Sequence, residues 1–291
     1  DAHNDAYVVL QGSPLALAAS SGVQHNDVSE SASAVALQAG VAHGLLQLGT
    51  DGALAYTPAA GFSGIDVFNY FALGEYGAKD SGQATIHVVP VNVVGATTTL
   101  NLLALTAPEQ IASTYAAFFG RAADALGFRF WVDQFKAGLP TQGAAKLFAN
   151  IASSFGISAE AKALYPFLDN PFGATDGQIS AFLDSVYNNL FNRSSDALGL
   201  AYWTGQIKAT LQAGEFVGSV LVNIMSGAQD TAAGKDITTL MGKVAVSLEY
   251  VREQESHHTV WAGASDVAAA TNLLDAVASD VPSVLIGVKN A

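Results

Sequence analysis

Residues 115–137 read YAAFFGRAADALGFRFWVDQFKA, and residues 187–209 read YNNLFNRSSDALGLAYWTGQIKA. The two segments align at a constant offset of 72 residues, with 11 of 23 positions identical. The shared residues are Tyr115/Tyr187, Phe119/Phe191, Arg121/Arg193, Asp124/Asp196, Ala125/Ala197, Leu126/Leu198, Gly127/Gly199, Trp131/Trp203, Gln134/Gln206, Lys136/Lys208 and Ala137/Ala209. A repeat of apolar and turn residues is typical of a scaffold that uses one supersecondary unit twice. It favours a structural role over an active site.

Each copy predicts a helix, a turn and a second helix. Gly120 and Asn192 are residue types that end a helix in the left-handed conformation. Asp124 and Asp196 follow four residues later and are strong N-caps for the next helix. The duplicated unit is therefore a helix-turn-helix.

Arg121 and Arg193 lie at the end of the first helix of each copy, where a cation favours the helix dipole and the nearby aspartate. The alternative is that this Arg/Asp pair clamps a carboxylate or a sugar, but ion pairs in turns are more often structural. The remaining shared residues predict close helix packing, with glycines allowing approach and tryptophans filling the space: Gly127, Gly199, Trp131 and Trp203.

The motif is similar to a bacterial domain of unknown function, DUF4214, whose signature runs Y-x-x-x-x-GR-x-x-D-x-x-G-x-x-YW. The matching residues are Tyr115, Gly120, Arg121, Asp124, Gly127, Phe130 and Trp131, and then Tyr187, Arg193, Asp196, Gly199, Tyr202 and Trp203. Phe130 replaces tyrosine in the first copy and Asn192 replaces glycine in the second. The resemblance covers about residues 106–250. It implies a setting in S-layer-like proteins, type I-secreted adhesins and other surface proteins, and supplies no catalytic residues.

The first 95 or so residues predict short strands separated by turns. The strands are expected at residues 7–10, 15–18, 35–41, 45–48, 53–57, 66–73 and 83–91, all rich in β-branched, aromatic or leucine residues and bounded by turn residues. Asp51-Gly52 supplies the positive φ that a tight hairpin needs. This number of strands in under 100 residues indicates a β-sandwich.

Two blocks of this region carry a further resemblance. Residues 51–58 read DGALAYTP and residues 61–70 read GFSGIDVFNY. They resemble the cadherin-like or immunoglobulin-like repeats of large bacterial surface proteins, in which "dGsf-YtP-aGF-G-DsF-Y" recurs. Gln24-His25 departs from the usual Leu-Ala-type pair. The aromatic residues of these blocks are the expected anchors of the sandwich core: Tyr56, Phe62, Phe68 and Tyr70.

The fold class predicted is α+β and multidomain, an N-terminal antiparallel β-sandwich followed by an all-α domain. We expect the sandwich at 1–95, a linker at 96–105, the duplicated helical domain at 106–255 and an extension at 256–291. Capping boxes at residues 106–109 and 175–178 predict helix starts, and residues 138–140 predict a break. The extension predicts a helix at 267–278 and an apolar segment at 281–288, which either packs back or pairs with a neighbouring subunit.

Composition excludes several classes of protein. The 291 residues include 12 Lys+Arg against 25 Asp+Glu, for a net charge of −13. Such a chain lacks the basic footprint that nucleic acid requires. It has no cysteine, hence no disulfide or Cys-ligated metal, and no apolar run of transmembrane length. The start at Asp1 indicates a processed protein or a piece of a longer one.

Calcium is the expected ion. The first 100 residues hold eight acidic side chains against one basic residue, Lys79, and oxygen-rich loops suit a hard cation. Candidate ligands are Asp1, Asn4, Asp5, Asn26, Asp27, Glu30 and Asp66, with Asp80 as an alternative to the last. That these acids are only solvated turn residues is equally open. Glycine-rich calcium repeats are absent.

No catalytic pattern is present, neither HExxH, GxSxG, Walker A nor GxGxxG. His257-His258 with Glu253 and Glu255 is the densest set of ligand types, but adjacent histidines on a helix diverge by about 100°. An exposed helix end is favoured over a metal site there. We expect no enzyme and no organic cofactor.

The first functional hypothesis is a secreted, non-enzymatic structural protein of the bacterial cell surface, which self-associates in an S-layer, filament or adhesin with calcium as a stabiliser. The second is a carbohydrate-binding module or adhesin tip, in which an exposed tryptophan, Trp131, Trp203 or Trp261, stacks on a surface polysaccharide. The first predicts oligomers that dissociate on chelation. The second predicts a monomer that binds glycans.

Overall fold

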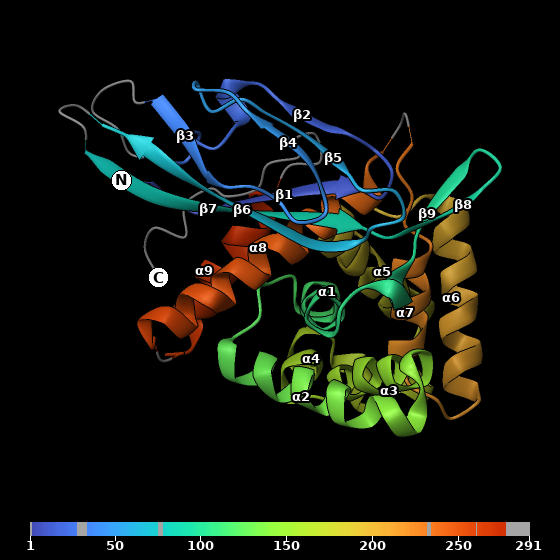
Figure 1. The fold of residues 1–291 in the computed structure, drawn as a ribbon. Helices are drawn as coiled ribbons and strands as arrows, with labels where there is room; N and C mark the ends of the chain where they lie inside the picture. Colours follow the sequence, from blue (N-terminus) through green and yellow to red (C-terminus); the bar gives the residue numbers. More distant parts are fainter. Residues whose placement is uncertain (1, 28–33, 75–77, 232–233, 260, 278–291) are drawn as a thin grey trace.

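The computed structural model describes residues 2–27, 34–74, 78–231, 234–259 and 261–277. Its N-terminal part is a β-sandwich of two sheets, in the orders β1-β7-β6-β3 and β2-β5-β4 (Figure 1). The strands are β1 (Asp5–Leu10), β2 (Leu15–Leu17), β3 (Ala34–Ala39), β4 (Gly44–Leu48), β5 (Leu54–Pro58), β6 (Gly64–Leu73) and β7 (Lys79–Val89). Neighbouring strands are antiparallel except β1 and β7, which are parallel. The predicted sandwich is confirmed, with this one parallel pair.

The Asp-Gly turn forms as predicted. Gly52 has φ 85° and lies between β4 and β5, and the Gly49 amide donates to the Ala53 carbonyl at 2.7 Å. Gly22 passes so close to this turn that a Cβ atom there would lie 1.9 Å from the Gly52 carbonyl oxygen. The turn is thus packed against the backbone at Gly22, and no side chain fits at that position.

The four-stranded sheet is covered on both faces. Successive side chains of a strand point to opposite faces, so Tyr7 and Val9 of β1 enter the core between the two sheets, whereas Ala6 and Val8 enter the core of the helical part. Helix α8 (Asp236–His257) lies across β1 on that second face. The molecule has three layers, sheet, sheet and helices (Figure 1).

The segment after the sandwich is packed structure. β8 (Val91–Val94) and β9 (Thr97–Leu100) form a hairpin whose turn holds Gly95 at φ 61°, and a 3-10 helix, η3 (Leu102–Ala104), follows. The predicted linker, residues 96–105, therefore contains β9 and η3. The physical reason is burial: Leu100 and Leu102 belong to the helical core, and the Leu100 amide donates to the Ala228 carbonyl at 3.1 Å.

The rest of the described chain is helical, as predicted. The helices are α1 (Ala107–Phe119), α2 (Ala125–Gln142), α3 (Ala144–Gly156), α4 (Ala159–Leu164), α5 (Asp176–Phe191), α6 (Ala197–Gln212), α7 (Gly218–Ser226), α8 and α9 (Ala264–Asp275). Both predicted capping boxes form, Thr106 with Glu109 on α1 and Thr175 with Gln178 on α5. Helix α9 is the helix expected at 267–278, and residues 281–288 lie outside the described part.

The break predicted at residues 138–140 is wrong. Helix α2 continues through Gly138 and Pro140 to Gln142 and ends at Gly143, which has φ 74°. Pro140 falls in the last turn of α2, where the lack of its N–H group removes one helix hydrogen bond and leaves the rest of the helix intact. Pro140 therefore does not break α2, which ends two residues later.

A buried polar contact joins the sandwich to the helices. His87 Nδ1 of β7 lies 3.2 Å from Glu109 Oε1 of α1, and both side chains are buried. Burial alone would raise the pKa of Glu109, but the contacts with His87 and Thr106 outweigh it and hold that pKa below its usual value. The carboxylate that caps α1 is thus also the one that contacts the sheet.

No helix in the described ranges is long and apolar enough to cross a membrane.

Candidate functional site

Both turns of the repeat have the predicted geometry. Gly120 and Asn192 are left-handed, with φ 62° and 55°. The Asp124 carboxylate accepts from the Gly127 amide at 2.7 Å, and that of Asp196 from the Gly199 amide at 2.8 Å. Two helix ends and two helix starts are therefore satisfied by residues of the motif itself.

Arg121 is a buried cation with a partner that the motif does not contain. Its Nε and Nη2 atoms donate to the two carboxylate oxygens of Glu160, on α4, at 2.7 and 2.8 Å. Asp124, the expected partner, is 3.8 Å away. The guanidinium also lies over the rings of Tyr115 and Phe119, 5.2 and 5.3 Å from their centroids. Burial opposes the charge, but Glu160 keeps the Arg121 pKa raised.

Arg193 repeats this arrangement in the second copy. Its Nε and Nη2 atoms donate to Asp236 of α8 at 2.9 and 2.6 Å, and it lies 5.2 Å from the Tyr187 ring centroid. In both copies Nη1 donates to the next backbone carbonyl, that of Ala122 or Ser194. All three guanidinium nitrogens of each arginine are engaged. This supports the structural interpretation over a ligand clamp.

The predicted glycine role holds for one copy. A Cβ atom at Gly127 would lie 2.4 Å from the Tyr115 hydroxyl, so α1 and α2 approach closely there. A Cβ atom at Gly199 would meet nothing nearer than Asp196, at 3.5 Å. For Gly199 the close approach is absent because the Tyr187 hydroxyl instead accepts from Trp203 Nε1, at 2.8 Å.

The three tryptophans have different environments. Trp203 is tied to Tyr187, and Trp261 lies over the Arg121 guanidinium at 5.0 Å. Trp131 packs against Phe155, 5.2 Å between ring centroids, but within the described chain its indole N–H makes no hydrogen bond. Of the candidate sugar-stacking residues, Trp131 also lines a cavity.

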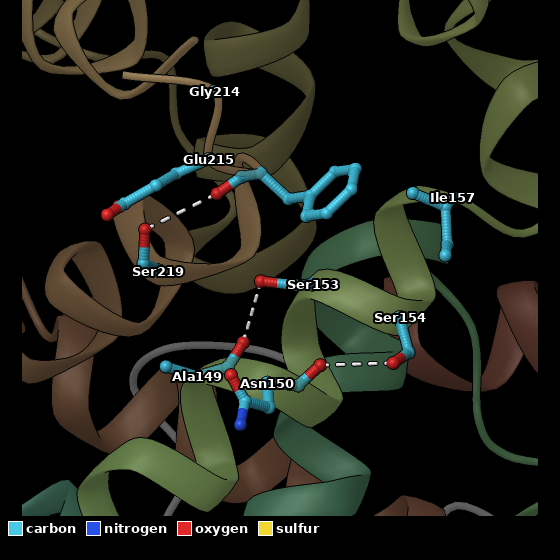
Figure 2. A pocket seen from close by; sticks show the side chains of 9 residues that line it. Ala149, Asn150, Ser153, Ser154, Ile157, Gly214, Glu215 and Ser219 are labelled. Atoms are coloured by element: carbon cyan, nitrogen blue, oxygen red, sulfur yellow. Dashed lines mark hydrogen bonds between the residues drawn. The ribbon is translucent and has the colours of Figure 1, made fainter.

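Two cavities adjoin along α3 and share Asn150 and Ser154. One, of about 400 Å³, lies between α2 and α3, and the other, of about 440 Å³, lies between α3 and the start of α7. The first is lined by Trp131, Gln134, Ala137, Gly138, Gln142, Leu147, Asn150, Ile151 and Ser154, and the second by Ala149, Asn150, Ser153, Ser154, Ile157, Gly214, Glu215, Phe216 and Ser219. Figure 2 shows Asn150, Ser153 and Ser154 of α3 on one side of the second cavity and Gly214, Glu215 and Ser219 on the other. Sequence periodicity gave no sign of this groove.

Each copy also exposes the same apolar pair. Leu126 and Phe130 of α2 are 76% and 54% exposed, and the equivalent Leu198 and Tyr202 of α6 are 85% and 58% exposed. Members of each pair are four residues apart and share a helix face. We call these the α2 pair and the α6 pair. The two pairs lie on the outer surface and do not contribute to the hydrophobic core.

Part of the predicted calcium set comes together at the N-terminal end of the sandwich. Asp27 Oδ1 accepts from the His3 amide at 2.7 Å, and Asp80 Oδ2 from the Ala2 amide at 2.6 Å. Asn26 Nδ2 donates to the Asn4 carbonyl at 2.9 Å. These loop contacts bring Asn4, Asn26 and Asp27 near Asp5, whereas Asp80 lies toward Asp27.

This cluster has more oxygen acceptors than donors. The Tyr70 hydroxyl lies 2.9 Å from the carbonyls of His3 and Val23 and 3.0 Å from Asp5 Oδ2, yet it carries one proton. Within the described residues, Asn26 Oδ1 and Asp27 Oδ2 are buried and accept no hydrogen bond, and the hydroxyl of Tyr7, beside Asp5, is a buried donor without a partner. Burial raises the pKa of Asp5 well above its usual value and also raises that of Asp27. The surplus of acceptors favours a bound cation or a proton.

The other predicted ligands are elsewhere. Asp66 accepts from the amides of Ala42 and His43 at 2.8 and 2.9 Å and from the Tyr56 hydroxyl at 2.9 Å, so its oxygens are used in the sandwich. Asp1 and Glu30 lie outside the described residues. Within the described ranges, no three His, Asp or Glu side chains are grouped to hold a metal. At the end of α8, His258 is an exposed left-handed C-cap.

Comparison with known families agrees with this architecture. Residues 2–89 match the model of the bacterial Ig domain, and residues 152–226 match that of the domain of unknown function DUF4214. The chain thus combines a bacterial Ig domain with a DUF4214 domain. The second match contains one copy of the repeat, residues 187–209, and the first copy precedes it. The Ig domain indicates a surface or adhesion-type protein.

Whole-chain similarity is weak. No curated protein matches the chain. One solved structure that aligns is the crystal structure of a 2,6-sialyltransferase of Vibrionaceae Photobacterium sp. JT-ISH-224 in a ternary complex with CMP and lactose, at 11% identity. The alignment covers 94% of this chain and 63% of the sialyltransferase, with a TM-score of 0.23. A score this low supports no argument about fold or activity.

Proposed function

We propose that this chain is a non-enzymatic structural protein of the bacterial cell surface, a self-associating subunit of an S-layer, an extracellular filament or an adhesin. The observation that carries the proposal is the repeated exposure of the α2 pair and the α6 pair. Large exposed apolar groups mark interaction surfaces when they gather. Two similar surfaces on one chain permit head-to-tail contacts, which give rings, filaments or layers.

The packing between the sandwich and the helices supports this role. A subunit of an ordered assembly must hold its contact surfaces in a fixed geometry. The sheet shared by both cores, together with the His87–Glu109 contact, joins the two parts without a flexible linker. The arginine pairs with Glu160 and Asp236 fix the turns of the helical repeat in the same way.

Calcium is a second part of the proposal. Carboxylate, amide and carbonyl oxygens are the ligands that Ca²⁺ prefers. Asp5, Asp27 and Asn26 would hold the ion, because Asp27 Oδ2 and Asn26 Oδ1 lack donors among the described residues and the Asp5 carboxylate lies in the same cluster. A bound ion would supply the positive charge that this cluster lacks and fix the ends of the loops around it.

The test is electron microscopy and light scattering of the native protein, with calcium and with EDTA. We expect oligomers that grow with concentration and shrink in EDTA. The double variant Leu126→Glu/Leu198→Glu should remain monomeric, whereas Leu164→Glu, an exposed leucine outside the two pairs, should assemble normally. Asp27→Asn should make assembly insensitive to EDTA. Monomers under every condition would reject the self-association proposal.

A carbohydrate-binding function is the second candidate, and one observation favours it. Trp131 lines a polar cavity, and in the described part of the chain its indole N–H has no hydrogen-bond partner, unlike that of Trp203 at the equivalent position. A glycan array with the intact chain tests this function directly. Binding by a monomer that never assembles would favour it over the first proposal.

A further inference from the structure

The two cavities along α3 form one continuous feature, here called the α3 groove, that runs from Trp131 to Phe216. They meet at Asn150 and Ser154, which are one helical turn apart on α3. Their volumes, about 400 and 440 Å³, fall in the range of roughly 300–1,000 Å³ that is typical of small-molecule sites. Two adjoining cavities suit an extended ligand better than a single compact one.

The charge of the groove selects against anions. Among the residues that line the two cavities, Glu215 of the second cavity is the one ionisable residue, and it makes no ion pair in the described chain. The protein as a whole carries a net charge of −13. A phosphate, sulfate or uronic acid would meet no cation here and would be repelled by Glu215. The ligand chemistry that remains is neutral and polar.

The polar groups of the groove leave both donors and acceptors for such a ligand. Asn150 Nδ2 donates to Gln142 Oε1 at 3.0 Å, which leaves Asn150 Oδ1 as an acceptor and Gln142 Nε2 as a donor. The Ser153 and Ser154 hydroxyls donate to α3 carbonyls at 2.8 and 3.0 Å, so their lone pairs stay available (Figure 2). Paired amide and hydroxyl groups of this kind match the vicinal hydroxyls of a sugar.

Aromatic groups flank these polar residues. Trp131 lines the first cavity, and its indole N–H makes no hydrogen bond to any described residue. Phe216, which is 49% exposed, lines the second cavity. An aromatic face packs against the apolar C–H face of a pyranose ring, while an indole N–H serves as a polar handle at its edge. Apolar ring faces next to amide and carboxylate oxygens suit a ligand that has both apolar C–H faces and polar hydroxyl groups.

We propose that the α3 groove binds a neutral oligosaccharide, with Trp131 and Phe216 stacking on sugar rings and Gln134, Gln142, Asn150 and Glu215 hydrogen-bonding their hydroxyls. This inference rests on the second function proposed above and does not depend on self-association. The site belongs to the first copy of the repeat, because in the second copy the Trp203 indole N–H already donates to the Tyr187 hydroxyl.

The test is calorimetric titration of the full chain with neutral hexasaccharides, maltohexaose, cellohexaose and chitohexaose, and with an alginate hexamer as the anionic probe. At least one neutral probe should bind with a Kd below about 1 mM, and alginate should not. Trp131→Phe and Gln134→Ala should each weaken binding about ten-fold. The matched controls are Trp203→Phe and Gln206→Ala, the same changes at the equivalent positions, and they should bind within about two-fold of the parent.

Three results would overturn the proposal: no neutral hexasaccharide binds, alginate binds as well as the neutral probes, or the control variants lose as much affinity as the groove variants. Thermal unfolding of each variant separates lost binding from lost folding. Light scattering on the same samples separates this site from self-association, because Trp131→Phe should still assemble. Assembly without sugar binding would reject the groove alone.

Discussion

The arginine turn of the first copy is buried and that of the second copy is half-exposed, although the two turns have the same geometry. The Arg121 side chain is 5% exposed and that of Arg193 is 40% exposed. Trp261 covers Arg121, and no aromatic ring outside the motif does so for Arg193 within the described chain. The comparison shows that the motif determines local geometry, whereas the surrounding elements determine burial and hence energy.

Each copy also depends on an acid from outside the motif. Glu160 follows Arg121 by 39 residues and comes from α4, and Asp236 follows Arg193 by 43 residues and comes from α8. The two elements are different, but each presents a carboxylate to both Nε and Nη2. The arginine of each copy is therefore paired with a carboxylate from a different element outside the motif.

The largest effect should come from removing the two arginines separately. Arg121→Ala removes packing beneath three rings and a buried charge pair, and we expect it to lower the free energy of unfolding by about 3 kcal/mol. Arg193→Ala, at a half-exposed site, should cost about 1 kcal/mol. Urea denaturation followed by circular dichroism measures both. Equal losses would break the comparison between the buried turn and the half-exposed turn.

A pH experiment should separate the two copies next. The carbonyls of Asn188 and Asn189 at the end of α5 accept from the buried Lys243 Nζ, at 3.4 and 2.7 Å. At the equivalent place in the first copy, the Ala117 carbonyl accepts from the neutral Asn189 amide. Burial lowers the pKa of Lys243 to about 8 from 10.5.

Between these pH values the unfolded chain holds the Lys243 proton and the folded chain has released it, so the free energy of unfolding rises with pH by up to about 3 kcal/mol. Above pH 10 the buried tyrosines act in the opposite direction, because burial raises the pKa of residues such as Tyr115 and only the unfolded chain ionises. The difference between parent and Lys243→Met isolates the lysine. Parallel stability curves from pH 7.5 to 10 would contradict this assignment.

The smallest expected effect compares the glycines of the two copies. Gly127→Ala pushes a methyl group against the Tyr115 hydroxyl and should destabilise the protein by about 1–2 kcal/mol. In Gly199→Ala the new methyl group makes only van der Waals contact with Asp196, and the change should be stabilising by about 0.5 kcal/mol. Thermal unfolding of the two variants measures the opposite signs. A loss of similar size at both positions would show that the close approach in the first copy does not matter.

Local chemistry was readable from the sequence. The alternation of short apolar segments, the Asp51-Gly52 step and the two capping boxes each act within a few residues, and all of these elements form. Gly120 and Asn192 were readable for the same reason, since a left-handed helix end is a property of one residue. Gly95 also has a positive φ, as a tight turn requires. The Val and Thr residues around it were interpreted as a linker, because the sequence does not show that Leu100 is buried.

Long-range pairing was not readable. Glu160 and Asp236 are two of 25 acidic residues, and nothing near the motif marks them as the arginine partners. The α3 groove is likewise assembled from α2, α3 and the start of α7, whose lining residues carry no common spacing. The calcium prediction stays a prediction. The sequence named the loop acids, but it could not tell whether Asp27 or Asp66 lies near Asp5, because that depends on the strand register.

The parallel pairing of β1 with β7 has a mechanical consequence. Six consecutive residue pairs, from Asp5 opposite Ala84 to Leu10 opposite Val89, join the strand at the chain's beginning to the strand that leads into the helices. A tensile force applied at the N-terminus and resisted at the helical end pulls these two strands in opposite directions along their length. The hydrogen bonds between them then bear the load together in shear instead of opening one after another, so the sandwich transmits tension as a unit.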